Sequence, residues 1–340
     1  MRLSKIRFLC FLFSVFVIFT GSLSARGAGE NRRNILTIYG IKGSSGLGII
    51  RMFENPPQAE GFDIRLEALA QADLVAARFI SGEALVGILP PNIAAKIASS
   101  LGNIQVAAVT GNGMLNLLSS DPDIGSIEDL RGKRVEIAGA GATPEYVFKR
   151  ILMDRGIDPE KDITLGSNLA YPEIAQALIS GRISTALIPE PFATMALRGR
   201  SQAGQANESE ALPVIRQIGN IQEEWKNRYN SDYPMTVLAV NKKFASGNPS
   251  AMTAILQSLE DSIRWIVSNP EEAGELAEKH NMGFPQESAA LAIPRSNYIF
   301  ISAVSARPSL EALFRVFLDF SPQSIGGALP EDDFYYQPKS

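Results

Sequence analysis

The amino-acid sequence predicts an α/β fold made of two similar lobes. Between residues 35 and 110, short apolar segments typical of strands alternate with segments of helical periodicity. This alternation indicates a mostly parallel sheet with helices on both faces. The segment 79–82 (FISG), followed by a strand and Pro90, returns 99 residues later as 178–181 (LISG), followed by a strand and Pro189. A chain of 340 residues is also long enough for two domains of roughly 100–200 residues each.

The first lobe is predicted from strands that end in turns and pass into helices. The turn 42–46 (KGSSG) follows the first strand, and Pro90 and Pro91 stop the third. Small and polar residues at these points are typical of turns between regular elements. We predict strands at 35–39, 63–68, 85–89 and 104–110, and helices at 47–53, 74–80 and 93–99.

The opening of the second lobe is the most legible part of the sequence. Ser126 and Asp129 have the spacing of a capping box, which predicts a short helix directly after them. The strand 134–138 and the small-residue turn 139–142 then lead to Thr143 as the N-cap of a second helix. A strand, a turn of small residues and a helix N-terminus present free backbone N–H groups, so we expect a site for an anionic or strongly polar ligand group here.

The later elements follow the same signals. The segment 199–210 is rich in Ser, Gln, Gly and Ala, which predicts a surface loop. The strand 235–240 would carry the chain back to the first lobe, and the block after it is expected to be helical, without a strand, and to pack on that lobe. We predict a strand at 163–165 and helices at 221–229, 249–267, 270–280, 286–293 and 309–320.

The first residues have the layout of a secretory signal peptide. Three basic residues precede an apolar run at 8–19, and small residues follow at 21–25. We predict a signal peptide at 1–25; an uncleaved anchor is the alternative, although the run is shorter than the roughly 20 residues that span a bilayer. Cys10, the only cysteine, lies inside the run. The mature chain therefore has none, as expected for a chain that buries a sizeable core without disulfides.

Composition argues against several classes of function. The net charge is −4 and no cluster of Lys and Arg with aromatics is visible, which predicts no nucleic-acid partner. After Cys10 no cysteine remains and the only histidine is His280. A Cys–His pair or a zinc cage of His and Cys is therefore excluded, and a Ser–His–Asp triad would depend on His280 alone. The sequence predicts no catalytic residue, no metal and no cofactor.

Three segments together resemble a known family. The segment 127–135 (IEDLRGKRV) resembles the I-x-D-L-(K/R)-G-K-x-V opening of the second lobe in the nitrate/sulfonate/taurine and thiamine-precursor group of ABC-transporter substrate-binding proteins. The segment 171–181 (YPEIAQALISG) resembles that group's E-x-x-x-A-L-x-x-G helix. The segment 184–193 resembles its D-A-x-x-x-x-E-P segment, except that the usual Asp before Ala186 is missing.

The resemblance implies a type II periplasmic-binding-protein fold. This α/β fold has two lobes joined by two crossover strands, with a ligand cleft between them that closes like a hinged jaw. It implies lobe 1 at 34–116 and 235–340 and lobe 2 at 117–234. The implied function is the solute-binding component of an ABC importer: a periplasmic or secreted monomer that passes a small-molecule solute to an ABC permease in the inner membrane.

The resemblance also implies which residues contact the solute. In this group the contacts come from the first turn of lobe 1, the ends of its third and fourth strands, a helix N-terminus of lobe 2 and the E-P segment. Capping or turn formation alone is the alternative role for the Ser, Thr and Asn residues, and Glu190 could instead bond backbone amides near the hinge. With the aromatics placed near the cleft, the implied residues are Lys42, Ser44, Ser45, Asn92, Asn112, Gly141, Ala142, Thr143, Tyr171, Glu190 and Tyr233.

The class of solute and two other functions stay open. Aromatic stacking would suit a pyrimidine or a vitamin-like ring, whereas a cleft without aromatics would favour a small sulfonate or oxyanion. No arginine lies in the predicted turns, where Lys42 is the only cation, and this weakens the small-anion alternative. The other functions are a pyrimidine-precursor enzyme of the same fold, which would have to use His280, and a ligand-sensing domain without transport.

Overall fold

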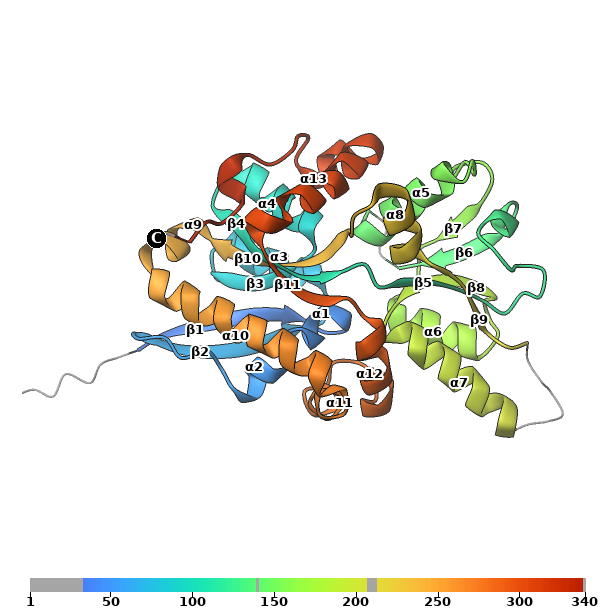
Figure 1. Cartoon of the computed structure of the whole chain (residues 1–340), viewed down its shortest axis with the longest axis horizontal. Coiled ribbons are helices and arrows are strands. Elements are labelled where there is room, and N and C mark those ends of the chain that lie inside the picture. Colours follow the sequence, from blue (N-terminus) through green and yellow to red (C-terminus); the bar gives the residue numbers. More distant parts are fainter. Residues whose placement is uncertain (1–32, 139–140, 207–212, 339–340) are drawn as a thin grey trace, which may run out of the picture. The chain divides into compact units, whose positions relative to one another are not determined.

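Two β-sheets, each with helices packed around it, form the structure (Figure 1). The computed structural model describes residues 33–138, 141–206 and 213–338, so the predicted signal peptide lies outside the described residues. The first sheet has the strand order β11-β4-β10-β3-β1-β2. Its strands are β1 (Asn34–Ile41), β2 (Phe62–Leu69), β3 (Val86–Leu89), β4 (Ile104–Asn112), β10 (Pro234–Asn241) and β11 (Tyr298–Ser302).

The second sheet lies entirely within the middle of the chain. Its strand order is β7-β6-β8-β5-β9. The strands are β5 (Leu115–Ser119), β6 (Arg134–Ile137), β7 (Thr164–Gly166), β8 (Thr185–Pro189) and β9 (Arg216–Asn220).

Both sheets are mixed. In the first, β1 pairs in parallel with β2 and β3, as the strand–helix alternation predicts, whereas β10 is antiparallel to β3 and β4, and β11 is antiparallel to β4. In the second, β6 is parallel to β7 and β8, and β5 is antiparallel to β8 and β9. The central strands β3, β5 and β8 are buried along their whole length, which explains why most of their residues are apolar.

The helices begin and end at the residues that favour helix termini. Proline stands in the first turn of α4, α5, α6, α10 and α11, where its missing N–H costs nothing. The helices are α1 (Ser44–Leu47), α2 (Ile50–Glu54), α3 (Ala72–Ser81), α4 (Pro91–Leu101), α5 (Thr143–Asp154), α6 (Tyr171–Ile179), α7 (Phe192–Ala206), α8 (Ile221–Tyr229), α9 (Lys242–Gly247), α10 (Pro249–Ser268), α11 (Pro270–Lys279), α12 (Gln286–Ala292) and α13 (Ala303–Phe320).

Several predicted elements are wrong in detail. The expected surface loop at 199–210 is helical as far as Ala206, because α7 continues through it; residues 207–212 lie outside the described residues. The C-terminal block does contain a strand, β11, and α13 begins six residues before the predicted start. Strands β5 and β9 were also not predicted. These three missed strands all pair antiparallel with their neighbours, so they lie outside the parallel strand–helix pattern on which the prediction rests.

The capping box at Ser126 is only half formed. The Asp129 carboxylate accepts hydrogen bonds from the Ser126 N–H at 2.9 Å and from the Gly125 N–H at 3.0 Å. The Ser126 hydroxyl also donates to Asp129, at 3.0 Å, instead of accepting from the helix. The helix is a single 3-10 turn at Glu128–Leu130, so Asp129 fixes the turn before it.

The apolar core is shared between the sheets. One buried cluster includes Val106 of the first sheet and Val135 of the second, and the other includes Leu36 and Ile188. Residues 33–340 accordingly form a single compact unit by their contacts. Within the described ranges, no helix combines the length and the apolar character that crossing a membrane requires.

Candidate functional site

The chain crosses twice between the sheets. Each crossing joins strand ends of one sheet to strand ends of the other, and the edge of a sheet here means this row of strand ends, not its outermost strand. β4 ends at Asn112 and β5 begins at Leu115, so three peptide steps separate the sheets there. Because a chain spans at most about 3.6 Å per residue, these two edges lie within roughly 11 Å of each other. The second crossing passes through Tyr233 into β10, where Pro234 pairs with Asn112.

The edge of the first sheet collects four of the predicted ligand residues. β1, β3 and β4 run in one direction and end there, whereas the antiparallel β10 begins there. Ser44 follows β1, Asn92 follows β3, Asn112 ends β4 and Tyr233 precedes β10. Ser44 and Asn92 lie in the first turns of α1 and α4, so hydroxyl, amide and phenol groups line one edge.

The facing edge of the second sheet collects three more. Thr143 follows β6, Glu190 follows β8 and Tyr171 follows β7, and these three strands run in parallel. Ala142, not Thr143, is the N-cap of α5, so the predicted cap is displaced by one residue. The Gly141 N–H donates to the Glu145 carboxylate at 2.6 Å, and the rest of the predicted turn, Gly139 and Ala140, lies outside the described residues.

Direct contacts join the two edges. The Ser44 hydroxyl donates a hydrogen bond across the boundary to the backbone oxygen of Glu190. On the first sheet's own side, the Tyr298 hydroxyl of β11 holds Ser44 by donating to its backbone oxygen at 2.8 Å. A Cβ added at Gly43 would lie 3.7 Å from the ring of Phe192. The β1–α1 turn therefore packs against the E-P segment, so the structure brings these two segments of predicted site residues together.

Glu190 is the most heavily bonded residue at this boundary. Its side chain is completely buried; Oε2 accepts from the Thr194 N–H at 3.0 Å and Oε1 lies 2.9 Å from Nε of Arg295. Nη2 of Arg295 also donates to Oε1 of Gln217 at 2.9 Å. Sequence reasoning missed Arg295, because it stands in the 3-10 turn before β11, which was not predicted.

Several buried polar atoms near the edges have no hydrogen-bond partner among the described residues. Three of these atoms belong to predicted ligand residues: Asn92 Oδ1, Thr143 Oγ1 and the Tyr233 hydroxyl oxygen. The three residues are at most 5% exposed. An unpaired buried polar group costs about 1–3 kcal/mol, so these atoms are suited to hydrogen bonds with a bound molecule.

Aromatic rings stand beside these groups. Tyr171 stacks on Phe192 with ring centroids 5.9 Å apart, and Phe192 meets Phe284 edge-on at the same distance. Tyr233 packs edge-on against Trp225 at 5.3 Å. Burial raises the pKa of the Tyr171 and Tyr233 phenols, so both hydroxyls keep their protons and can donate as well as accept.

Three residues that the sequence singled out stand apart from this bonding. Lys42 is exposed, and its backbone N–H bonds to Leu69 O. Ser45 is half-buried beside Ser44. Nε2 of His280 lies 2.6 Å from Glu54 of α2, so this histidine belongs to a surface contact. No cluster of His, Cys, Asp and Glu in the described part of the chain could hold a metal.

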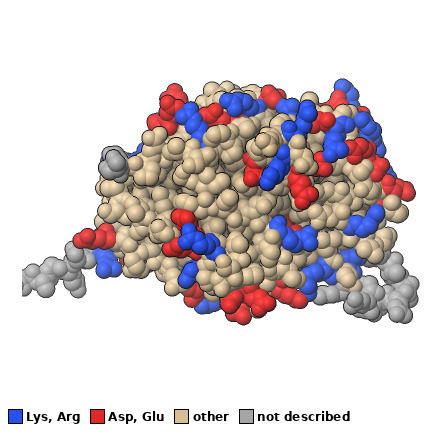
Figure 2. Space-filling model, in the orientation of Figure 1, with Lys and Arg blue, Asp and Glu red and all other residues tan. Residues whose placement is uncertain are grey.

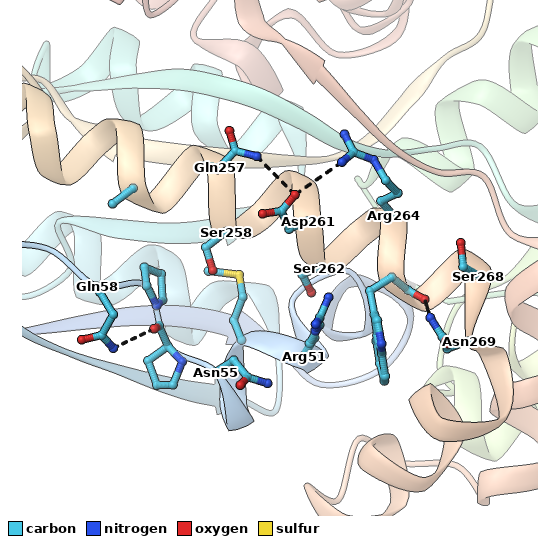
Figure 3. Close-up of a pocket in the computed structure, with 15 residues that line it drawn as sticks. Arg51, Asn55, Gln58, Gln257, Ser258, Asp261, Ser262, Arg264, Ser268 and Asn269 are labelled. Carbon is cyan, nitrogen blue, oxygen red and sulfur yellow. Dashed lines mark hydrogen bonds and ion pairs between the residues drawn. The ribbon is translucent and has the colours of Figure 1, made fainter.

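The surface also carries a groove that contains none of the predicted residues. It lies between α2 and α10, has a volume of about 640 Å³, and is lined by residues such as Arg51, Asn55, Asp261 and Asn269 (Figure 3). The Arg51 guanidinium carbon lies 5.2 Å from the centre of the Trp265 ring. Basic and acidic side chains are interspersed on the face in Figure 2.

Known proteins resemble this chain in sequence and in fold. Residues 120–280 match the NMT1-like family, and no curated protein sequence matches significantly. The structure is similar to that of an ABC transporter from Parabacteroides distasonis, with a TM-score of 0.75 and 21% identity over 90% of this chain and 100% of that one. The chain has the periplasmic-binding-protein fold.

Two further structures agree with this fold. The periplasmic aliphatic sulphonate binding protein SsuA from Escherichia coli has a TM-score of 0.67 and 14% identity over 90% of this chain and 93% of that one. The periplasmic nitrate-binding protein NrtA from Synechocystis has a TM-score of 0.56 and 14% identity over 76% and 69%. The resemblance predicted from the sequence motifs is confirmed, and these structural neighbours are binding proteins for solutes.

Proposed function

We propose that this chain is the solute-binding component of an ABC importer. In this proposal residues 34–116 with 235–340 form one lobe and residues 117–234 the other, and the lobes close on one small solute. The chain would act without catalysis, as a periplasmic monomer freed from the signal peptide 1–25, and would deliver the solute to an ABC permease. The binding-protein fold and the match of residues 120–280 to the NMT1-like family support this assignment.

One observation carries the proposal. Counting only partners in the described part of the chain, unpaired buried polar atoms lie on both facing edges: Asn92 Oδ1 and the Tyr233 hydroxyl on the first, and Thr143 Oγ1 on the second. Folded proteins pair nearly all such atoms. A solute held between the edges would pair them from both sides at once, and contacts with both lobes exist only when the lobes are closed.

The lining groups favour a polar solute with a ring over a small anion. The amide and the hydroxyls can both donate and accept hydrogen bonds, and Tyr171 with Phe192 offers aromatic surface for stacking. The Arg295 guanidinium is already bonded to Glu190 and Gln217. A pyrimidine or vitamin-like solute therefore comes first, with sulfonates and oxyanions second.

A melting screen tests this function. A solute that binds the folded state raises the melting temperature by mass action, so pyrimidines, riboflavin and related vitamins, ethanesulfonate, taurine and nitrate are each added to the mature protein. The variants Thr143→Val and Tyr233→Phe remove one unpaired hydroxyl each. We expect them to lose the solute-induced rise while keeping or slightly raising the melting temperature without solute.

Tyr335→Phe is the matched control. The Tyr335 hydroxyl is also buried without a partner, but it lies in the C-terminal segment against Phe334. This variant should keep the full solute-induced rise. A rise that survives both Thr143→Val and Tyr233→Phe would refute the site, and a screen without any rise would refute this set of solutes.

A further inference from the structure

Glu190, Arg295 and Gln217 form a contact that joins the two sheets. Glu190 directly follows β8 and Gln217 lies in β9, both of the second sheet, whereas Arg295 ends the 3-10 turn shortly before β11 of the first. Arg295 donates through Nε to Glu190 and through Nη2 to Gln217, each at 2.9 Å. One guanidinium thus bridges two elements of the opposite sheet.

Because Glu190 is buried, its carboxylate depends on the bridge to Arg295 for a charged partner. A fully buried carboxylate is unfavourable unless it is paired and hydrogen-bonded. Only two partners reach its oxygens among the described residues, the Thr194 N–H on Oε2 and Arg295 on Oε1. Thr194 belongs to the same sheet's α7 and stays with Glu190 when the lobes separate, so Arg295 is the partner that depends on closure.

The backbone of Glu190 ties the same contact to the candidate ligand site. Its oxygen accepts from the Ser44 hydroxyl, and its N–H donates to the Met114 oxygen of the crossover at 3.0 Å. The Glu190 side chain is completely buried and each of its carboxylate oxygens already accepts a hydrogen bond from the protein, so in this arrangement Glu190 is bonded to the protein itself. When this contact forms, it therefore places Ser44 beside the second sheet's edge, and it does not add a hydrogen bond between Glu190 and a solute.

We propose that Glu190, Arg295 and Gln217 are a closure latch, in which Arg295 is a positioning residue that sets the balance between the open and closed lobes. This inference rests on the proposed function. Without Arg295 the closed state contains a buried carboxylate with one neutral partner, whereas in the open state water solvates Glu190. Loss of the guanidinium therefore favours opening and shortens the time for which a solute is retained.

The experiment measures the distance between the lobes in the solute-free protein. The mature chain contains no cysteine, so Lys96→Cys and Lys161→Cys, both exposed positions, accept a donor and an acceptor dye for single-molecule energy transfer. Arg295→Ala should raise the ratio of open to closed molecules by about tenfold or more, as expected for a hydrogen bond to a charged group. Arg295→Lys should restore part of the closed population, and Gln217→Ala should have a smaller effect in the same direction.

Arg264→Ala is the control, because Arg264 pairs with Glu260 inside α10 and does not bridge the sheets. The latch is refuted if Arg295→Ala, Gln217→Ala and the control give the same distance distribution. If Arg295→Ala fails to fold, Arg295→Lys and Gln217→Ala decide in its place. The outcome is independent of the solute screen, because a wrong solute assignment leaves the solute-free distributions unchanged, and a wrong latch leaves the screen unchanged.

Discussion

A single glycine determines how closely the first crossover approaches its neighbours. A Cβ built at Gly113 would lie 2.0 Å from Gln222 Oε1 and 2.1 Å from the Tyr233 ring, and both side chains are buried. We predict that Gly113→Ala destabilises the protein by about 1–3 kcal/mol or more, because the buried side chains of Gln222 and Tyr233 have no space to move into. Urea unfolding measures the change. Gly247→Ala, which has nothing within 4 Å, should stay close to wild type.

The turn before the Glu128–Leu130 helix should give a specific acid response. Hydrogen bonds from the Gly125 N–H, then from the Ser126 hydroxyl and N–H, lower the pKa of Asp129. A carboxylate with a lowered folded-state pKa stabilises the protein above its unfolded pKa, and this stabilisation is lost as the pH falls through the folded-state value. Asp129→Asn should therefore lower the melting temperature at pH 7, and the difference should shrink at pH 3.

The matched control for this acid response is Asp123→Asn, an exposed carboxylate in the same segment. It should change the melting temperature little at either pH. An Asp129→Asn difference that is as large at pH 3 as at pH 7 would contradict the pKa argument, because the stabilisation by the Asp129 carboxylate is lost as the pH falls toward its lowered folded-state pKa.

At the scale of elements, α8 leads the chain into the second crossover, and its N-cap is the side chain of Asn220. Asn220 Oδ1 accepts from the Gln222 N–H at 3.1 Å and the Glu223 N–H at 3.4 Å. Asn220→Ala should cost about 1 kcal/mol of stability in urea unfolding, as N-cap replacements do. Asn227→Ala, at an exposed position of the same helix, should cost much less. Equal costs would mean that the cap does not stabilise α8.

The elements also show which signals a sequence carries and which it lacks. Helix α8 was predicted with its observed bounds, and β1 to β4 within a few residues, because caps, prolines and apolar runs are local features. Strand β11 (YIFIS) does carry a local signal, because its aromatic and β-branched residues favour strands. The prediction missed it in a block that is otherwise helical, and its pairing with the distant β4 is not a local feature. The sequence-based prediction places a loop at the polar end of α7, although Ala and Gln there favour a helix.

At the scale of the whole molecule, strand direction explains why many of the candidate site residues lie together. Ligand residues of open α/β sheets follow the carboxyl ends of parallel strands, so Ser44, Asn92 and Thr143 could be selected before their contacts were known. The partner of Glu190 could not be selected, because Arg295 is 105 residues away and reaches it only through tertiary packing. Unpaired atoms such as Asn92 Oδ1 likewise depend on all their neighbours together.

The shared core predicts how the whole molecule unfolds. Each of the two buried clusters contains residues of both sheets, so neither sheet can lose its packing without exposing apolar surface of the other. Calorimetry of the solute-free mature protein should therefore give one transition, with equal calorimetric and van't Hoff enthalpies. Phe192 joins Tyr171 of the second sheet's α6 to Phe284 beside the first, and Phe192→Ala should separate the transition into two.

The comparison variant is Phe244→Ala. Phe244 is equally well buried, but its ring packs edge-on against Phe62 within the first-sheet half of the molecule, with centroids 5.7 Å apart. Both variants should lower the melting temperature, since each removes a buried aromatic ring worth about 3–5 kcal/mol. Only the loss of Phe192 weakens the apolar contact across the boundary, so only that variant should reduce the ratio of van't Hoff to calorimetric enthalpy. The same reduction in both variants would show that the two halves are not coupled through Phe192.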